Sequence, residues 1–301
     1  MPVAHYDTHS ASTGKKLLLS IILNCIITVA QIIGGLMSGS LSLLSDALHN
    51  FSDVLSLVIS YIANRLVKKE ASIRRTFGFK RAEVMAAFIN ASSLVIIAIF
   101  LIFEAIKRLQ EPKTIESTIV ILLSALAIIA NGLSVLILRK NSRENMNMRS
   151  AYVHLITDMM ASIAVLIGGL LMRFYQIYWI DSILTLAIAI YLIVMGYHLL
   201  KSSFKILMLF TPEDIEVEKL ISDISQLPYV TNIHHVHIWQ LNEEEIHLEA
   251  HIDFKENVSI QQFGSLLREI EDILTTKYGV NHVTLQPEFG MAGDKNIIVQ
   301  D

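Results

Sequence analysis

Long runs of apolar residues alternate with short polar connections over residues 15–210. Six of these runs are long enough to cross the hydrocarbon core of a bilayer, which takes roughly 20 helical residues. They are Leu17–Leu36, Leu41–Val67, Val84–Ile106, Ile119–Leu138, Tyr152–Phe174 and Ile180–Leu209. The pattern therefore predicts a domain of six transmembrane helices at residues 15–210, preceded by a polar N-terminal tail at residues 1–14.

The pattern changes at Thr211, where amphipathic and alternating segments replace the continuous apolar runs. It predicts a helix, a two-stranded hairpin, a second helix and a last strand. These are Asp214–Leu227, Val236–Leu241, Ile246–Phe254, Ser259–Tyr278 and His282–Pro287. The order αββαβ predicts a small open sheet with its helices on one face, within an α+β domain at residues 211–290. Residues 291–301 are expected to form a flexible C-terminal tail.

Composition supports a membrane protein. Of the 301 residues, 53% are hydrophobic and 17% charged, with a mean hydropathy of +0.52. This composition supplies more apolar surface than a soluble domain of this size needs. The single cysteine, Cys25, excludes a disulfide framework and a cysteine-rich metal site.

Charge is distributed unevenly. From Pro212 onward, the chain has 17 acidic residues and 5 Lys and Arg, which gives a net charge of −12. This negative charge argues against a nucleic-acid partner. Before Pro212, basic residues gather in two connections, between the second and third and between the fourth and fifth predicted helices. Those in the latter are Arg139, Lys140, Arg143 and Arg149. Positive-inside bias therefore predicts that both termini lie in the cytoplasm. We expect a multi-pass protein of the cell inner (plasma) membrane.

Two pairs of ionisable residues interrupt the apolar runs. His49 precedes Asp53 by four positions, and His154 precedes Asp158 by the same spacing. On a helix this spacing places both side chains of a pair on one face. Two such pairs on facing helices bring two nitrogens and two carboxylates to one point, a ligand set for a tetrahedral divalent cation, with zinc the first candidate. The alternative is a structural polar network between helices.

Asp46 lies one turn before His49 on nearly the same face. It is a candidate for a group that orients a ligand, for a carboxylate on the entry path, or for a helix cap. Asp181 and His198 lie near opposite ends of the sixth predicted helix and receive no role.

The C-terminal domain holds a second concentration of metal-ligand residues. His247, Glu249 and His251 share one face of a predicted strand, and Glu288 ends a neighbouring strand. Together they predict a second metal site, or alternatively only the polar face of a half-buried sheet. His234 has the parity of the apolar residues around it, so it reaches that face only at a strand end or a bulge.

These residues resemble the cation diffusion facilitator family of zinc/proton antiporters, over nearly the whole chain. The resemblance rests on the paired His-x-x-x-Asp motifs, on Thr76-Phe77-Gly78-Phe79-Lys80-Arg81-Ala82-Glu83, and on the His-x-x-His-Ile-Trp and Gln-x-Glu signatures of the C-terminal domain. It implies six transmembrane helices, a cytoplasmic metallochaperone-like (ferredoxin-like) domain and a homodimer. By position, it implies transport ligands His49, Asp53, His154 and Asp158, and cytoplasmic ligands His234, His251 and Glu288.

The sequence thus predicts a secondary transporter that exports Zn²⁺ from the cytoplasm in exchange for protons by alternating access. Its expected partners are the lipid bilayer, divalent metal ions and protons. The rival cargoes are Cd²⁺, Co²⁺ and Mn²⁺. A membrane metalloenzyme is less well supported, because there is no His-Glu-x-x-His motif and four protein ligands leave no open position for water. A metal sensor would need an output module, and the sequence contains none that we recognise.

Overall fold

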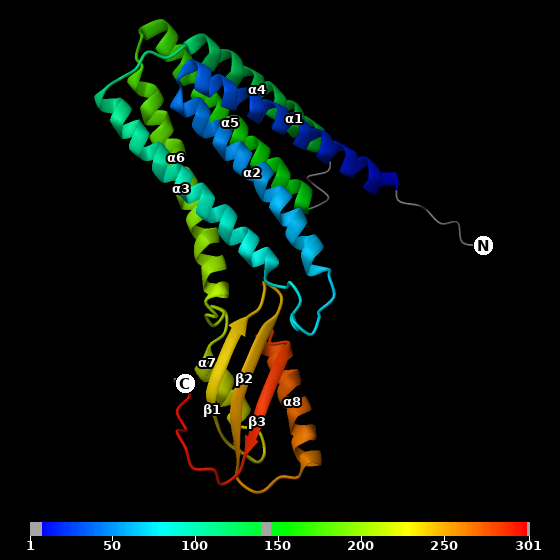
Figure 1. Ribbon diagram of the computed structural model, residues 1–301. Helices are drawn as coiled ribbons and strands as arrows, with labels where there is room; N and C mark the ends of the chain where they lie inside the picture. Colours follow the sequence, from blue (N-terminus) through cyan, green and yellow to red (C-terminus); the bar gives the residue numbers. More distant parts are fainter. Residues whose placement is uncertain (1–7, 140–145, 300–301) are drawn as a thin grey trace, which may run out of the picture. The chain divides into compact units, whose positions relative to one another are not determined.

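The computed structural model describes residues 8–139 and 146–299, which form eight helices and three strands (Figure 1). The chain divides into two compact units. One comprises the chain up to residue 61 together with residues 89–200, and the other comprises residues 62–88 and the chain from residue 201 onward. Lys140 and Arg143, two of the charges behind the predicted orientation, lie outside the described residues, as does part of the predicted N-terminal tail.

Six long helices correspond to the six apolar runs. They are α1 (Thr8–Ser38), α2 (Leu41–Val67), α3 (Ala82–Gln110), α4 (Ser117–Leu138), α5 (Met146–Tyr175) and α6 (Trp179–Leu207). Among the described residues, five helices are long and apolar enough to cross a membrane, namely all but α2. α2 has the length, but Asp46, Asp53 and Arg65 interrupt its apolar pattern. A domain with five apolar candidate spans is therefore confirmed, and the count of six remains a prediction.

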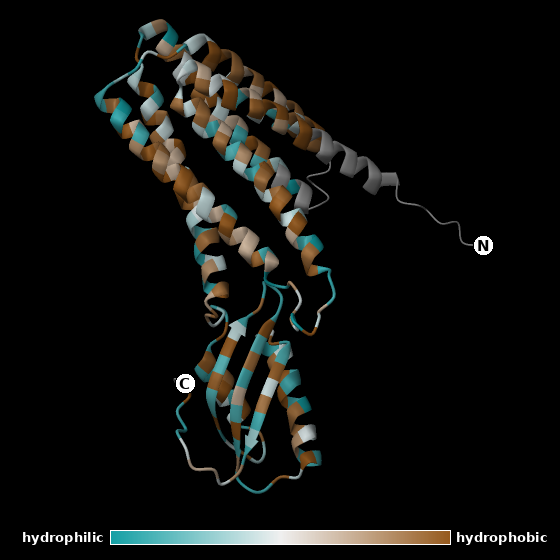
Figure 2. Ribbon diagram, in the orientation of Figure 1, coloured by the Kyte–Doolittle hydropathy of each residue, from teal (hydrophilic) through white to brown (hydrophobic). Residues whose placement is uncertain are grey.

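Apolar side chains cover the outside of these helices, whereas polar ones are buried between them. Figure 2 shows hydrophobic residues dominating α3, α4 and α6, with a more mixed pattern on α2. Large side chains such as Phe100, Phe103 and Leu122 are exposed, while Gln31 and Asn50 are fully buried. This distribution is expected of helices whose outer surface meets lipid and whose interior holds a polar site.

Small residues let the helices approach closely. α4 packs against α1 and α5, and Ala98 and Leu101 of α3 pack against Ala189 and Leu192 of α6. A Cβ atom at Gly35 of α1 would lie 3.2 Å from the backbone of Leu44 on α2. Glycine at this position therefore permits the close contact between α1 and the first turn of α2.

The C-terminal unit contains a three-stranded sheet and two helices. The elements are α7 (Val217–Ser225), β1 (Val230–Gln240), β2 (Ile246–Phe254), α8 (Ile260–Tyr278) and β3 (His282–Glu288), in the predicted order αββαβ. The strand order is β1-β2-β3, with β1 and β2 antiparallel and β2 and β3 parallel. Because parallel neighbours need a crossover, α8 links β2 to β3. A small sheet with helices is confirmed, and the finer ferredoxin-like assignment stays a prediction.

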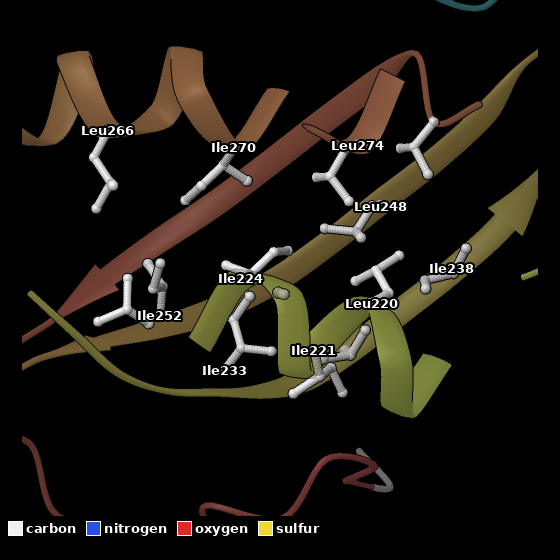
Figure 3. Packing of buried hydrophobic residues seen from close by; sticks show 14 of the residues in the cluster. Leu220, Ile221, Ile224, Ile233, Ile238, Leu248, Ile252, Leu266, Ile270 and Leu274 are labelled. Atoms are coloured by element: carbon white, nitrogen blue, oxygen red, sulfur yellow. The ribbon is translucent and has the colours of Figure 1, made fainter. Parts of the chain in front are cut away.

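Both helices of this unit bury their apolar faces in one core (Figure 3). Leu220 and Ile224 of α7 and Ile270 and Leu274 of α8 are fully buried with alternate residues of the strands, such as Ile252. α8 begins with a capping box, in which Ser259 and Gln262 satisfy each other's backbone N–H groups. It ends at Gly279 in the left-handed conformation, with φ of 69°.

Two irregular segments contact the sheet. In the connection between α2 and α3, Lys80 pairs with Glu245, and the Phe77 ring lies edge-on to the His247 ring at 5.7 Å between centroids. Residues 291–299 form no helix or strand, but the carbonyl groups of Asn296 and Ile297 accept hydrogen bonds from backbone N–H groups of β1.

The domain boundaries given by the sequence remain predictions.

Candidate metal sites

Two His–Asp pairs, one on α2 and one on α5, converge within the helical unit. We call His49, Asp53, His154 and Asp158 the four-residue cluster. His154 Nε2 lies 3.3 Å from Asp53 Oδ2 and 3.5 Å from Asp158 Oδ2. His49 Nε2 lies 3.7 Å from Asp158 Oδ1, and its Nδ1 lies 3.7 Å from Asp53 Oδ2. Each imidazole thus contacts both carboxylates, its own helical partner and that of the facing helix, which the four-residue spacing makes possible.

The four-residue cluster is buried on one side and accessible on the other. The side chains of His49 and Asp158 are 6% and 0% exposed, whereas those of Asp53 and His154 are 31% and 38% exposed. Both oxygens of Asp158 lack a hydrogen-bond partner in the described part of the chain. Unsatisfied buried carboxylate oxygens are costly, and a divalent cation among two imidazoles and two carboxylates would satisfy them.

Asp46 belongs to a separate polar network. Its Oδ2 accepts hydrogen bonds from Gln31 Nε2 at 2.7 Å and from Ser162 Oγ at 3.0 Å, and Asn50 Nδ2 donates to Gln31 Oε1 at 3.4 Å. All four side chains belong to fully buried residues. The network connects α1, α2 and α5, so Asp46 helps to fix the two helices that carry the four-residue cluster. Its role toward the ligands themselves remains a prediction.

Asp181 caps α2 from another helix. Although it lies in the first turn of α6, its carboxylate accepts hydrogen bonds from the backbone N–H groups of Leu41 and Ser42 at 2.7 and 3.2 Å. It also accepts from the hydroxyl groups of Ser40 and Ser42 at 2.6 and 2.5 Å. Because a carboxylate satisfies the free N–H groups at a helix start, Asp181 fixes the position of α2. Sequence reasoning missed this role, since no local pattern joins residues about 140 positions apart.

Three residues of the C-terminal unit form the sheet cluster: His234, His251 and Glu288. Each offers a ligand atom within 4.8 Å of the others. His251 Nδ1 lies 2.8 Å from Glu288 Oε1, and His234 Nε2 lies 3.6 Å from Glu288 Oε2. The strand register shifts between His234 and His237, which is the bulge that His234 requires to join this cluster. Two nitrogens and one carboxylate suit zinc.

Only one of the three β2 residues predicted as metal ligands lies in the sheet cluster. His251 joins the sheet cluster, but His247 stacks on Trp239, with ring centroids 5.3 Å apart, and lies 4.5 Å from the His282 ring. Glu249 is exposed. The sheet cluster therefore draws one ligand from each of the three strands, and not several from the face of β2.

Two further charged residues contact the sheet cluster. Asp253 Oδ2 lies 3.4 Å from His234 Nδ1, and Lys295 Nζ donates to Glu288 Oε2 at 2.7 Å and to Asp253 Oδ1 at 3.0 Å. The hydrogen bond from Lys295 lowers the pKa of Glu288 below its usual value, while burial lowers the pKa of His234. An ionised carboxylate and a neutral imidazole are the forms that bind metal. No sequence signal singled out Asp253 or Lys295.

Two family models match the chain. The model described as "Cation efflux transmembrane domain" matches residues 17–208, and that described as "Cation efflux protein, cytoplasmic domain" matches residues 212–289.

Curated proteins resemble the chain over nearly its full length. A "Cadmium, cobalt and zinc/H(+)-K(+) antiporter" of Bacillus velezensis is 35% identical over 99% of this chain and 96% of its own. "Zinc transporter ZitB" of Pectobacterium atrosepticum is 33% identical, covering 97% and 91%. "Metal cation efflux system protein CzcD" of Cupriavidus metallidurans is 31% identical, covering 96% and 90%.

Proposed function

The chain belongs to the cation diffusion facilitator family of cation efflux proteins, and on that premise we propose that it exports Zn²⁺ from the cytoplasm in exchange for protons. Family membership makes it a multi-pass membrane transporter and not an enzyme. The observation that carries the proposal is the convergence of two imidazoles and two carboxylates on facing helices, with both oxygens of the buried Asp158 lacking a partner among the described residues.

The proposed transport ligands are His49, Asp53, His154 and Asp158. Two carboxylates neutralise the double charge of the cation, and two borderline nitrogen donors favour zinc over harder ions. The same lone pairs of the imidazoles and carboxylates can take protons, so a proton and the metal compete for them. Exchange of one for the other at a site exposed alternately to the two sides of the membrane couples their movements in opposite directions.

The arrangement of the helices supports a site open toward the cytoplasm. Asp53 and His154 are the partly exposed ligands. They lie nearest to the α2–α3 and α4–α5 connections, which carry most of the Lys and Arg found in the connections between the six helices. Under positive-inside bias, those connections are cytoplasmic. We propose six transmembrane helices, α2 included, in the inner (plasma) membrane, with both termini in the cytoplasm.

We further propose that the C-terminal domain faces the cytoplasm, adopts a metallochaperone-like (ferredoxin-like) fold and joins two copies in a homodimer, as the family resemblance implies. Its sheet cluster is proposed to bind zinc through His234, His251 and Glu288. The distances between their ligand atoms support this assignment.

A broader cargo range is the second candidate function. The Bacillus velezensis relative is named for cadmium and cobalt as well as zinc, and imidazole and carboxylate donors bind all three metals. Fluxes of the three metals, measured in parallel in reconstituted vesicles, would rank them.

Zinc flux into proteoliposomes, followed with an enclosed zinc dye, tests the assignment of the transport site. We expect Asp158→Asn, and separately Asp53→Asn, to reduce flux at least about 100-fold, because each keeps the shape of the side chain but removes a charged ligand. Asp272→Asn on the exposed face of α8 is the matched control and should transport zinc as fast as the unsubstituted protein, the parent. A zinc flux equal to that of the parent in either cluster variant would refute the site.

A further inference from the structure

The ammonium group of Lys295 lies among the side chains of the sheet cluster and its neighbour Asp253. Its Nζ is 2.7 Å from Glu288 Oε2, 3.0 Å from Asp253 Oδ1 and 3.4 Å from His234 Nε2. An ammonium group has three N–H donors, and here three acceptors surround it. Two of these acceptors are carboxylates. Their negative charge is therefore already balanced in part by the positive charge of Lys295, which the chain itself supplies.

Two of the atoms that face Lys295 are atoms that a metal would use. His234 Nε2 has one lone pair, which either accepts a hydrogen bond from Lys295 or coordinates a metal. The other nitrogen of this ring, Nδ1, faces Asp253 instead. Glu288 Oε2 bonds Lys295 while Oε1 faces His251. A metal bound by His234 and Glu288 therefore competes with Lys295 for the same electron pairs, and two cations in one small cluster also repel.

Lys295 belongs to a segment that lies along β1. The carbonyl groups of Asn296 and Ile297 accept hydrogen bonds from the N–H groups of His235 and Val236, at 3.1 and 2.8 Å. These are bulge residues of β1, adjacent to His234. Most residues from 291 to 299 are exposed, so the segment has little apolar burial to hold it in place. The ion pairs of Lys295 are the charged part of its attachment.

We propose that zinc and the Lys295 ammonium group exchange at the sheet cluster, so that zinc binding releases residues 291–299 from β1. The proposal rests on zinc binding by His234, His251 and Glu288 as proposed above. Lys295 then sets the zinc concentration at which the cluster fills, and Asp253, once free of Lys295, becomes available as a further oxygen donor. The C-terminal segment is attached without zinc and detached with it.

Zinc affinity of the full-length protein in detergent tests the competition. Asp53→Asn and Asp158→Asn are introduced together, so that titration calorimetry reports the sheet cluster. In this background we expect Lys295→Gln to tighten zinc binding about tenfold, the effect of removing one charge-assisted competitor. Lys277→Gln is the matched control, because Lys277 pairs with Asp223 and should leave the affinity unchanged.

A spin label on the segment tests its release. Cys25 is the one cysteine of the chain, so Cys25→Ser with Ile298→Cys allows a nitroxide to be attached at a single exposed position. We expect zinc to increase the mobility of the label in the parent. In Lys295→Gln the label should be mobile before zinc is added. In His251→Ala, which removes a zinc ligand but keeps all three acceptors of Lys295, it should stay immobile at zinc concentrations that saturate the parent.

The outcomes separate this inference from the function on which it rests. Zinc binding that is unchanged by His251→Ala with Glu288→Gln would remove the sheet cluster as a zinc site, and the exchange with it. Zinc binding that depends on those residues but is equal or weaker in Lys295→Gln would overturn the exchange alone. A label that remains immobile in zinc-saturated protein would overturn the release of the segment.

Discussion

His49 illustrates how one donor atom sets the preference of the four-residue cluster. Its ring is almost fully buried, and it contacts Asp53 and Asp158 from opposite nitrogens. An imidazole nitrogen offers a single, directional lone pair that suits a compact tetrahedral shell at about 2.0–2.1 Å from zinc. A carboxylate in its place binds through one oxygen or two and accepts larger cations and higher coordination numbers.

We therefore expect His49→Asp to retain zinc transport while increasing cadmium transport relative to zinc severalfold. The variant keeps a ligand at this position but exchanges nitrogen for oxygen and adds a negative charge. Cadmium and zinc fluxes measured side by side in proteoliposomes give the ratio. If the variant transports zinc with an unchanged ratio of cadmium to zinc flux, the packing of the helices and not the donor atom sets the selectivity for cation size.

Individual residues differ in how well the sequence predicted them. The four-residue cluster was identifiable because its pairs are local, with a spacing that one helical turn explains. Asp181 and Lys295 were not, because their partners lie 139–141 and 7–61 positions away and no periodic pattern links them. The sequence places Asp181 near a helix end and gives it no role, yet the residue is fully buried by its contacts with α2.

At the scale of elements, the lengths of the apolar runs and, after Thr211, the periodicity located every helix and strand of the described chain. The boundaries differ where local geometry breaks the pattern. β1 begins at Val230, six residues before the predicted start. The reason is the bulge between His234 and His237, which places two residues of β1 opposite one of β2 and so interrupts the alternation. α8 agrees closely with its prediction, because its amphipathic period and the capping residue Ser259 mark it clearly.

The amphipathic face of α8 allows a matched test of the core. Ile270 is fully buried and Ile260 is 92% exposed. We expect Ile270→Ala to destabilise the C-terminal unit by about 2–5 kcal/mol, through lost burial and a cavity, and Ile260→Ala to change it by less than about 1 kcal/mol. Urea unfolding of full-length protein, followed by Trp239 fluorescence in a Trp179→Phe background, measures both. Equal effects would show that α8 does not pack as described.

At the scale of the whole protein, the proposed exchange of metal for protons gives transport a direction. Both carboxylates of the four-residue cluster must be ionised, and both imidazoles neutral, to bind zinc. Where protons are abundant, they displace the metal, and where they are scarce, the metal binds. Because the two ions use the same atoms, the proton gradient supplies the free energy for zinc export.

We therefore expect an acidic lumen to drive zinc uptake into everted membrane vesicles, since protons leave the lumen as zinc enters. Flux should rise severalfold with an imposed gradient of about one to two pH units, each unit being worth about 1.4 kcal/mol per proton. An ionophore that collapses the gradient should abolish the increase, and Asp158→Asn vesicles should show none. Flux that is indifferent to the gradient would favour facilitated diffusion.

The cap that Asp181 places on α2 gives that helix a fixed pivot. The start of α2 is held to the start of α6 by four hydrogen bonds, whereas Asp53 lies twelve residues beyond Leu41, about 18 Å along the axis. A tilt of roughly 10° about this end would displace Asp53 by about 3 Å but Asp46 by about 1 Å. This tilt would break the contact between Asp53 and His154 and leave the Asp46 network nearly intact. On α2, the ligand farthest from the fixed end, Asp53, would therefore be the first to dissociate from the metal.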